Sequence, residues 1–494
     1  MGDEAERPQR PTSDLLAERR AKLERLRDAG VEPFPHTFGD REDIAAVRAR
    51  HEGLAPGEDS GERCRVAGRI TARRGHGKAA FIDLRDRSGQ IQLHSRADVL
   101  SDDSHERLAG LDLGDFVGVE GEVFATKSGE LTVRVAGWEL LAKSLRPLPD
   151  TYYGLEDTET RYRRRELDLL ANAEVRELFE LRARTIAAIR SWLDQEGFLE
   201  VETPVLQPLY GGALARPFTT HHNALDRDLY LRIATELYLK RCVVGGIERV
   251  YELGKDFRNE GISHKHNPEF TMLEFYEAYA DYNDAAGRLE RLVAHVAEQV
   301  LGTTRIERDG KSLELAPPWR RVTLRDAILE RTDIDIAAHP SREELAAAMD
   351  SEPDPAEGWG KLVDGLLSKL VEPQLDRPTF VVDYPAELSP FAKRHRSEDA
   401  LTERWEAFAG GIEIANAFTE LNDPDEQRAR FEAQRAELAR GDEEAQPFDE
   451  GFIEALEYGM PPTAGVGLGI DRLVMLLTGA HSLREVVLFP AMRT

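Results

Sequence analysis

The sequence predicts an α+β protein in which a small five-stranded β-barrel precedes a larger domain of strands and helices. Three observations support this prediction. Short runs of alternating apolar and polar residues fill residues 63–145, two strand-like runs flank a loop within residues 247–276, and apolar residues recur at helical spacing over residues 175–193. At 494 residues the chain is long enough for roughly three domains.

The order of these patterns along the chain predicts the domain boundaries. Residues 13–29 carry leucines among interleaved arginine and glutamate, which is typical of an amphipathic surface helix. Alternating runs with glycine-containing turns, and one helical interval near residues 100–110, are typical of a five-stranded barrel. The predicted parts are an N-terminal helical extension at 1–60, the barrel at 61–147, a proline-containing linker at 148–165, and a larger domain at 166–494 with a helical insertion around 283–375.

Composition restricts the class of protein and its compartment. The 65 basic and 92 acidic residues give a net charge of −27, which argues against nucleic-acid binding by the surface as a whole. Arginine clusters at 19–27, 65–74 and 161–165 leave room for a local basic track, although such clusters are usually solvated faces. Cys64 and Cys242 match no metal-ligand spacing, and no apolar run resembles a signal peptide or a membrane span. We therefore expect a cytoplasmic protein with no membrane partner.

The hairpin formed by residues 247–257 and 269–276 carries a carboxylate among aromatic rings. Side chains alternate faces along a strand, so Phe270, Glu274 and Tyr276 should share one face. A carboxylate on an aromatic face is costly to desolvate unless a cation meets it. That cation could be a neighbouring arginine, as in an ordinary salt bridge, or it could belong to a bound ligand.

Cationic residues near this hairpin are suited to a phosphate ligand. Arg258 offers the planar fork that binds carboxylate or phosphate, and Lys265 and His266 add charge in the loop. The run Gly-Val-Gly-Leu-Gly-Ile-Asp-Arg at 465–472 would let a ligand approach the backbone closely, with Arg472 at a strand-to-helix junction. Its spacing fails the dinucleotide fingerprint, and the sequence contains no Walker loop. These residues therefore predict a nucleotide site of neither the Rossmann nor the P-loop kind.

Three sequence elements follow one another along the chain: the segment GFLEVETPVLQPLYGG around Pro204, the arginine-bearing hairpin, and the Gly-x-Gly-x-Gly-x-Asp-Arg element. Together they resemble the three signatures of class II aminoacyl-tRNA synthetases. Further segments resemble the bacterial-type lysyl-tRNA synthetases, namely RPFTTHHNALD, YLRIATELYLKR, HNPEFTMLEFYEAYADY, EIANAFTELNDP and LFPAMR. This resemblance covers about residues 60–494. It implies an oligonucleotide-binding (OB) fold for the barrel and an antiparallel sheet flanked by helices for the catalytic domain.

The resemblance implies a two-step ligase reaction with ATP, L-lysine and tRNA(Lys). The lysine carboxylate would attack the α-phosphorus of ATP to give lysyl-adenylate and pyrophosphate, and the lysyl group would then pass to the 3'-terminal ribose of the tRNA. Such chemistry needs positioned cations rather than an enzyme nucleophile. Arg258 is the implied catalytic residue, and Phe270 and Arg472 would enclose the adenine. The implied ATP-binding residues are Arg258, Glu260, Lys265, His266, Phe270 and Arg472.

Two glutamates match the metal ligands of the family. Mg²⁺ prefers hard carboxylate oxygens and uses one or two of them together with substrate phosphates, so Glu406 and Glu413 would hold Mg²⁺ beside ATP. Strand parity raises a difficulty, because Glu413 is odd-numbered whereas Asn416 and Glu420, assigned to lysine, are even-numbered. Either the strand EIANAFTE contains a bulge or one assignment is wrong.

The resemblance implies that buried acceptors select the lysine side chain. An ε-ammonium donates three hydrogen bonds, which Glu274, Tyr276 and Glu420 could accept. A neutral analogue would leave a buried carboxylate unpaired, and this penalty is the source of discrimination. Glu236 and the backbone of Gly212 would hold the α-amino group. The implied lysine-binding residues are Gly212, Glu236, Glu274, Tyr276, Asn416 and Glu420.

Three residues of the barrel match the anticodon contacts of the family. Phe81 would stack on a base, a contact worth roughly 1–3 kcal/mol, and Gln92 and Glu130 would hydrogen-bond to bases. The alternative for Phe81 is an ordinary place in the barrel core. The expected partner at this surface is tRNA(Lys).

The helix at 175–193 and the Pro204 segment resemble the dimer interface of class II synthetases, which implies a homodimer. The alternative is that the apolar stripe of this helix packs within a single chain.

Three other functions are alternatives to a lysine-specific ligase. An aspartyl- or asparaginyl-type enzyme would need a cationic pocket, whereas Glu274 and Glu420 are acidic. An enzyme that lysylates protein would be expected to lack the barrel. A non-catalytic RNA-binding paralogue would have lost Arg258, Glu413 or Arg472, and all three are present.

Overall fold

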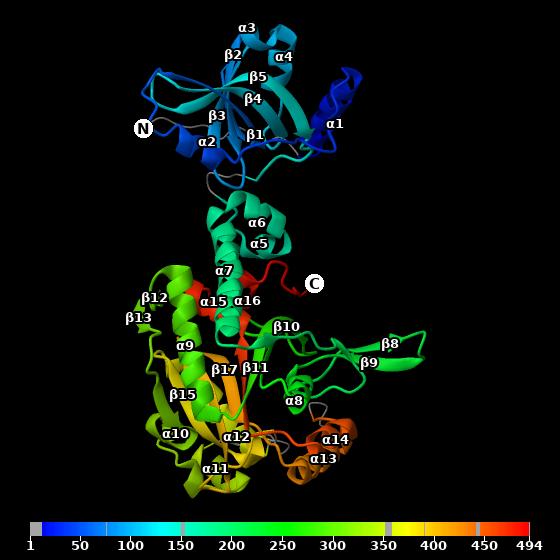
Figure 1. Ribbon diagram of the computed structural model, residues 1–494, viewed down its shortest axis with the longest axis vertical. Coiled ribbons are helices and arrows are strands. Elements are labelled where there is room, and N and C mark those ends of the chain that lie inside the picture. The colour runs from blue at the N-terminus through cyan, green and yellow to red at the C-terminus, as the bar shows by residue number, and fades with distance from the viewer. Residues whose placement is uncertain are drawn as a thin grey trace. The chain divides into compact units, whose positions relative to one another are not determined.

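The computed structural model describes residues 12–75, 77–149, 154–350, 358–389, 391–440 and 445–493. The chain forms two compact units, Met1–Glu156 and Asp157–Thr494, and each has its own hydrophobic core (Figure 1). The predicted extension, linker and insertion each include residues outside the described ranges, namely 1–11, 150–153 and 351–357.

The first unit is the closed five-stranded barrel that the alternating runs predict, with strand order β1-β2-β3-β5-β4. Alternate side chains such as Val66, Ile82 and Val133 point inward and have no exposed surface. The predicted helix at 13–29 is confirmed as α1. The elements are α1 (Thr12–Asp28), α2 (Ile44–Arg50), β1 (Asp59–Arg74), β2 (Ala79–Arg85), β3 (Gln90–Arg96), α3 (Ala97–Leu100), α4 (Asp102–Ala109), β4 (Phe116–Ala125) and β5 (Leu131–Ala142).

The second unit is built on an eight-stranded sheet with strand order β14-β15-β16-β17-β18-β11-β10-β6. Neighbouring strands are antiparallel except at the two edges, where β14 pairs with β15 and β6 pairs with β10 in parallel. The predicted hairpin and antiparallel sheet are thereby confirmed. The strands are β6 (Leu199–Glu200), β10 (Arg249–Phe257), β11 (Glu269–Ala278), β14 (Arg320–Thr323), β15 (Thr379–Pro385), β16 (Leu401–Ala409), β17 (Ile412–Thr419) and β18 (Thr463–Gly469).

Helices pack on both faces of this sheet (Figure 1). On β15, Phe380 belongs to the core formed with α7 (Ala173–Gln195), α9 (Tyr282–Leu301) and α15 (Ile470–Thr478), whereas the next residue, Val381, belongs to a second core on the opposite face. The second core contains α10 (Leu324–Thr332), α11 (Arg342–Ala348) and α12 (Trp359–Leu366). Within the predicted insertion at 283–375, α9 therefore lies in the main core and β14 belongs to the sheet.

The remaining elements surround this sheet. The three-stranded sheet β7-β9-β8 precedes α8, and α8 contacts β10 and β11. No helix in the described ranges is long and apolar enough to cross a membrane. The remaining helices and strands are α5 (Thr158–Arg163), α6 (Arg165–Ala171), β7 (Leu206–Gln207), β8 (Thr219–His222), β9 (Arg227–Leu231), α8 (Glu236–Val244), β12 (Arg305–Arg308), β13 (Lys311–Glu314), α13 (Pro424–Ala439), α14 (Glu450–Glu457) and α16 (Leu483–Val486). Short 3₁₀-helices lie at Ile336–Ala338, Glu372–Gln374 and Ala386–Leu388, and a π-helix lies at Leu367–Val371.

Candidate active site and base-binding surface

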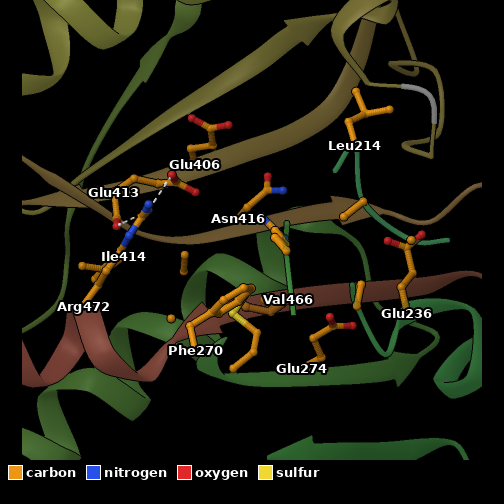
Figure 2. Close-up of a pocket in the computed structure, with 18 of the residues that line it drawn as sticks. Leu214, Glu236, Phe270, Glu274, Glu406, Glu413, Ile414, Asn416, Val466 and Arg472 are labelled. Atoms are coloured by element: carbon orange, nitrogen blue, oxygen red, sulfur yellow. Dashed lines mark hydrogen bonds and ion pairs between the residues drawn. The ribbon is translucent and has the colours of Figure 1, made fainter. Parts of the chain in front are cut away.

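A cavity of about 500 Å³ lies on the large sheet and is lined by side chains from β11, β16, β17, β18, the start of α8 and the loop 258–268. Figure 2 shows Glu236 and Glu274 at one end, and Glu413 and Arg472 at the other. We call the first the acidic end, formed by Glu236, Glu274 and Tyr276 with the buried Glu420 beside them. We call the second the cationic end, formed by Arg258, Lys265, His266 and Arg472.

The regular pairing of β11 explains why its alternate side chains reach the cavity. β11 pairs with β10 and β18 without a register shift, so Met272, Glu274 and Tyr276 all line the cavity, as the alternation predicts. The glycines of the run 465–469 lie directly opposite these three residues in the ladder. A Cβ at Gly465 would lie 2.4 Å from the Tyr276 ring, so glycine is required to leave room for this wall.

A bulge in β17 resolves the parity conflict in the sequence. Phe408 of β16 pairs with Glu413, whereas the preceding residue of β16 pairs with Ala415, which leaves Ile414 as an extra residue. An extra residue shifts the alternation of side chains by one position. Glu413 and Asn416 consequently both line the cavity (Figure 2), and the bulge is confirmed.

Glu274 lies at the acidic end and is only 6% exposed. Its Oε1 accepts a hydrogen bond from the backbone N–H of Thr235 at 3.2 Å, and its Oε2 accepts one from the Tyr276 hydroxyl at 3.2 Å. Burial, together with the carboxylates of Asp256 and Glu236, raises the pKa of Glu274 to about 8. Within the described ranges no arginine, lysine or histidine forms an ion pair with it. The salt bridge to a neighbouring arginine that the sequence left open is therefore not found.

Two other predicted residues, Glu236 and Glu420, are joined by a lysine that sequence reasoning missed. Lys240 is fully buried, and its Nζ lies 2.6 Å from Glu236 Oε1 and 2.5 Å from Glu420 Oε2. Glu420 is also fully buried and, unlike the other residues assigned to lysine, does not itself line the cavity. Burial raises the pKa of Glu420 to about 8, although Lys240 opposes this shift.

The backbone of Gly212 lies against the start of α8. Gly212 has a φ of +89°, and a Cβ there would lie 2.8 Å from the Cβ of Glu236. Its N–H donates to the side-chain oxygen of the buried Gln446 at 3.1 Å. The loop is thus fixed against Glu236, and both Gly212 and Glu236 line the cavity as predicted.

Arg258 follows β10 and lies beside Phe270, with its guanidinium carbon 5.0 Å from the ring centroid. Its Nε is buried and has no hydrogen-bond partner within the described ranges. Glu260 and His266 lie on the same loop, line the cavity and are exposed. A guanidinium with unused donors at the cavity wall is able to bind a carboxylate or a phosphate.

Two other cations of this end, Arg472 and Lys265, hold acidic partners. Arg472 donates to Glu413 Oε2 at 2.8 Å and to the Glu413 carbonyl oxygen at 3.0 Å, as the dashed lines in Figure 2 mark. Lys265 Nζ lies 2.7 Å from Glu372 Oε1. These side chains are therefore oriented before any ligand binds.

The predicted metal ligands, Glu406 and Glu413, line the same wall of the cavity. Glu406 accepts hydrogen bonds from Tyr384 at 2.9 Å and from Arg404 at 2.5 Å. Burial, partly opposed by Arg404, raises the pKa of Glu406 to about 7, and the nearby Glu413 adds to the shift. Two hard carboxylates on one wall, one of them with a pKa raised by its neighbour, suit a divalent cation.

On the barrel, Phe81 is half-buried on the outer face, so the alternative that it belongs to the barrel core is wrong. Its ring stacks on His94 with the centroids 4.5 Å apart and the planes 8° apart. Gln92 accepts a hydrogen bond from the Thr132 hydroxyl at 3.2 Å, and Glu130, two residues before Thr132, is exposed. His94 was missed by the sequence reasoning, although it lies two residues after Gln92 and therefore on the same strand face.

Arg404 was also missed, although it lines the cavity and contacts two predicted residues, Glu406 and Asn416. It lies two residues before Glu406 in one strand, and this spacing was the available signal. For Lys240, the signal was its position four residues after Glu236 in a helix.

Comparisons with known proteins agree with this architecture. The family model described as tRNA synthetases class II (D, K and N) matches residues 157–493, and that of the OB-fold nucleic acid binding domain matches residues 64–141. A lysine–tRNA ligase of Moorella thermoacetica is 53% identical over 484 residues, which are 97% of this chain and 98% of that protein. One from Bacillus subtilis is 49% identical over 486 residues, which are 97% of each chain. The chain therefore belongs to the lysine–tRNA ligases of the class II tRNA synthetase family.

Proposed function

We propose that the protein is an ATP-dependent ligase that activates L-lysine as lysyl-adenylate and transfers it to the 3'-terminal ribose of tRNA(Lys). One observation carries the choice of amino acid. The buried carboxylate of Glu274 has no cationic partner within the described ranges, while Arg258 has an unused donor at the same cavity. An amino acid with a cationic side chain satisfies both groups, because its second ammonium meets Glu274 and its carboxylate meets Arg258.

In this proposal Arg258 bridges the lysine carboxylate and the α-phosphate and stabilises the charge that develops during displacement. Glu236 and Gly212 bind the α-amino group, and Glu274 with Tyr276 receives the ε-ammonium. Asn416 lies on the same wall of the cavity. Glu420 acts on the ε-ammonium from behind this wall, where its Oε1 has no hydrogen-bond donor within the described ranges.

The nucleotide would occupy the cationic end, with its adenine between Phe270 and Arg472 and its outer phosphates near Lys265 and His266. Glu260 would orient the loop or hydrogen-bond the adenine. Mg²⁺ fits this end, since Glu406 and Glu413 offer hard oxygens on one wall. Mg²⁺ typically takes one or two protein carboxylates and its other ligands from phosphates and water. When bound, Mg²⁺ would supply charge neutralisation at the phosphates.

The outer face of the barrel would bind the anticodon, with Phe81 as the stacking platform and Gln92 and Glu130 as hydrogen-bonding residues. Phe81→Ala should raise the KM for tRNA by roughly 5- to 150-fold, which is the loss of one base stack. Lysine-dependent exchange of pyrophosphate into ATP does not use the tRNA and serves as the internal control. An equal loss in both assays would contradict an anticodon role for Phe81.

We also propose a homodimer in the cytoplasm. Exposed leucines follow α7, with Leu199 53% and Leu206 46% exposed, and a class II partner subunit would cover them. Both cysteines are free, which suits a reducing compartment. Sedimentation at micromolar concentration should give twice the mass of the 55.5 kDa chain, and Leu206→Arg should shift it toward the monomer.

The test of the function is pyrophosphate exchange into ATP with single amino acids. Lysine should support exchange, and aspartate and asparagine should not. Glu420→Gln should mainly raise the KM for lysine and leave the KM for ATP near that of the unmodified enzyme. Exchange that depends on aspartate or asparagine and not on lysine would overturn the proposal.

A further inference from the structure

The proposed roles leave the fully buried Lys240 without a function. Lys240 and Glu236 are four residues apart on α8, so their side chains meet on one face of the helix. Glu420 approaches from the end of β17 and completes a triad in which the Lys240 Nζ contacts both carboxylates. The Nζ also lies 5.9 Å from the centroid of the Phe391 ring, a cavity-lining residue.

Stability alone is a weak reason for such a triad. Removing three ionised groups from water is costly, and well-packed apolar side chains of similar volume are often at least as stabilising. The triad lies directly behind the surface to which we assign the substrate ammonium groups. A Cβ at the cavity-lining Gly465 would lie 2.0 Å from Glu420 Oε1, so this oxygen lies directly against a residue of the cavity wall.

The formal charge of the acidic end determines how many ammonium groups it can neutralise. It holds three carboxylates, Glu236, Glu274 and Glu420, and the one cation paired with them in the described ranges is Lys240. The neighbouring Asp256 shares the buried Arg232 with Glu252, and it also faces Arg258, whose charge opposes the rise that burial causes in the pKa of Asp256. Tyr276 stays neutral, because burial raises its pKa well above the usual range.

The paired cations of the other end do not change this sum, and the unpaired Arg258 is the group to which we assign the substrate carboxylate. Arg404 and Arg472 are paired with the carboxylates Glu406 and Glu413, and Lys265 is paired with Glu372. With its three carboxylates ionised, the acidic end therefore carries two uncompensated negative charges. Lysine brings two ammonium groups.

We propose that Lys240 is a fixed counter-cation that sets the charge of the amino-acid pocket to two negative units and so matches it to a substrate with two ammonium groups. This inference rests on the proposed function and makes Lys240 a positioning residue that acts through Glu236 and Glu420. An amino acid with one ammonium leaves one ionised carboxylate without a partner, and that carboxylate must be protonated or remain uncompensated.

The titration behaviour of the four groups is consistent with this role. Burial raises the pKa of Glu274 and of Glu420 to about 8, while Glu236 and Glu420 raise the pKa of Lys240 to about 12 against the effect of burial. Lys240 therefore keeps its charge through the neutral range. The two carboxylates can hold protons while the pocket is empty and release them when the ammonium groups arrive.

The experiment compares Lys240→Met, Glu420→Gln and the double variant in the full-length enzyme. Lys240→Met leaves three carboxylates for two ammonium groups, and Glu420→Gln leaves a net charge of one unit. Each should raise the KM for lysine at least about tenfold, from the loss or excess of one buried charge partner. The double variant restores two negative units and should return the KM for lysine to within about threefold of that of the unmodified enzyme.

Two further readouts separate this role from a merely structural one. Above pH 8 the ratio of the KM for lysine in Lys240→Met to that in the unmodified enzyme should rise, since the third carboxylate then ionises without a cation only in the variant. The KM for ATP should stay near normal in all variants. Arg241 lies next to Lys240 on α8 and forms a partly exposed ion pair with Asp449, so Arg241→Met is the matched control and should leave both KM values unchanged.

The inference is overturned if the KM for lysine is unchanged in Lys240→Met, or if the double variant is as impaired as either single variant. Parallel loss of lysine and ATP affinity together with a lower melting temperature would assign Lys240 to folding alone. These outcomes differ from failure of the proposed function, in which the unmodified enzyme itself would not use lysine for exchange.

Discussion

The two ends of the cavity differ in the elements that form them and in their exposure to solvent. The acidic end is made by regular elements, β11 and α8, and its carboxylates are almost free of solvent, with Glu274 6% and Glu420 0% exposed. The cationic end is made largely by the loop 258–268 and the start of α15, and its loop residues Glu260 and His266 are exposed.

This difference indicates that the acidic end selects the amino acid and that the cationic end binds ATP and releases pyrophosphate. Desolvated carboxylates on rigid elements impose a large penalty on any ligand without matching cations, and this is a source of specificity. At the cationic end, Lys265 and Arg472 are already paired with Glu372 and Glu413, so phosphates can replace acidic partners of these two cations without leaving buried charge alone. An end that binds ATP and releases pyrophosphate needs such reversible contacts, whereas an end that identifies the amino acid does not.

The largest expected effect is that of Arg258→Ala, because Arg258 serves both substrates. Exchange should fall by roughly 10²- to 10³-fold, the usual loss for one preorganised donor at a developing charge. Arg258→Lys keeps the charge but loses the planar fork, and its rate should lie between those of Arg258→Ala and the unmodified enzyme. A decrease in the exchange rate of less than tenfold in Arg258→Ala would contradict the proposal that Arg258 contacts both the lysine carboxylate and the α-phosphate.

The second largest effect is expected from a substitution at the acidic end, and it should concern lysine alone. Glu274→Gln should raise the KM for lysine by roughly 10- to 150-fold, the value of a hydrogen bond to a charged group, and leave the KM for ATP within about twofold. Steady-state exchange kinetics measure both constants. Glu269→Gln, at the exposed start of the same strand, is the matched control and should change neither.

The acidic end should also give the enzyme a characteristic pH dependence. Burial raises the pKa of Glu274 to about 8, so below this pH the group is mostly protonated and must lose a proton to bind an ammonium. The value of kcat/KM for lysine should therefore fall about tenfold or more per unit as the pH drops below 8. In Glu274→Gln this slope should become shallower, and an unchanged profile would assign the titration to another group.

The smallest effect is expected at the cationic end. Lys265→Ala should raise the KM for ATP by only about 2- to 10-fold, because its ammonium is partly exposed and already shared with Glu372. The KM for lysine should not change. Lys255→Ala, whose ammonium lies 3.6 Å from Glu269 on the surface, is the control. A Lys265→Ala effect on lysine as large as that on ATP would remove the functional difference between the two ends.

The sequence predicted the regular parts of this site well, because alternation along a strand is a local property. The common face of Phe270, Glu274 and Tyr276 followed from β11 alone, and the conflict between Glu413 and Asn416 correctly pointed to a bulge. The resemblance to a family supplied residue roles, such as that of Arg258, that no local pattern could give.

What the sequence did not predict depends on contacts between distant segments. Lys240 is in a helix and has the ordinary spacing of a surface ion pair with Glu236, and only the folded chain brings Glu420 to its other side. Glu420 was expected to face the substrate directly, whereas it does not line the cavity and lies against Gly465. The position of Glu420 depends on the pairing of β17 with β18, because Glu420 directly follows β17. This pairing joins segments that are distant in sequence.

A crystal structure of the enzyme with bound L-lysine is the most direct test of a pocket that selects its substrate through buried, uncompensated carboxylates. We expect the ε-ammonium to lie about 3 Å from the Glu274 carboxylate and the substrate carboxylate to lie on Arg258, with Lys240 still between Glu236 and Glu420. A lysine bound with its ε-ammonium away from Glu274, or a protein arginine turned inward to occupy that carboxylate, would contradict the account.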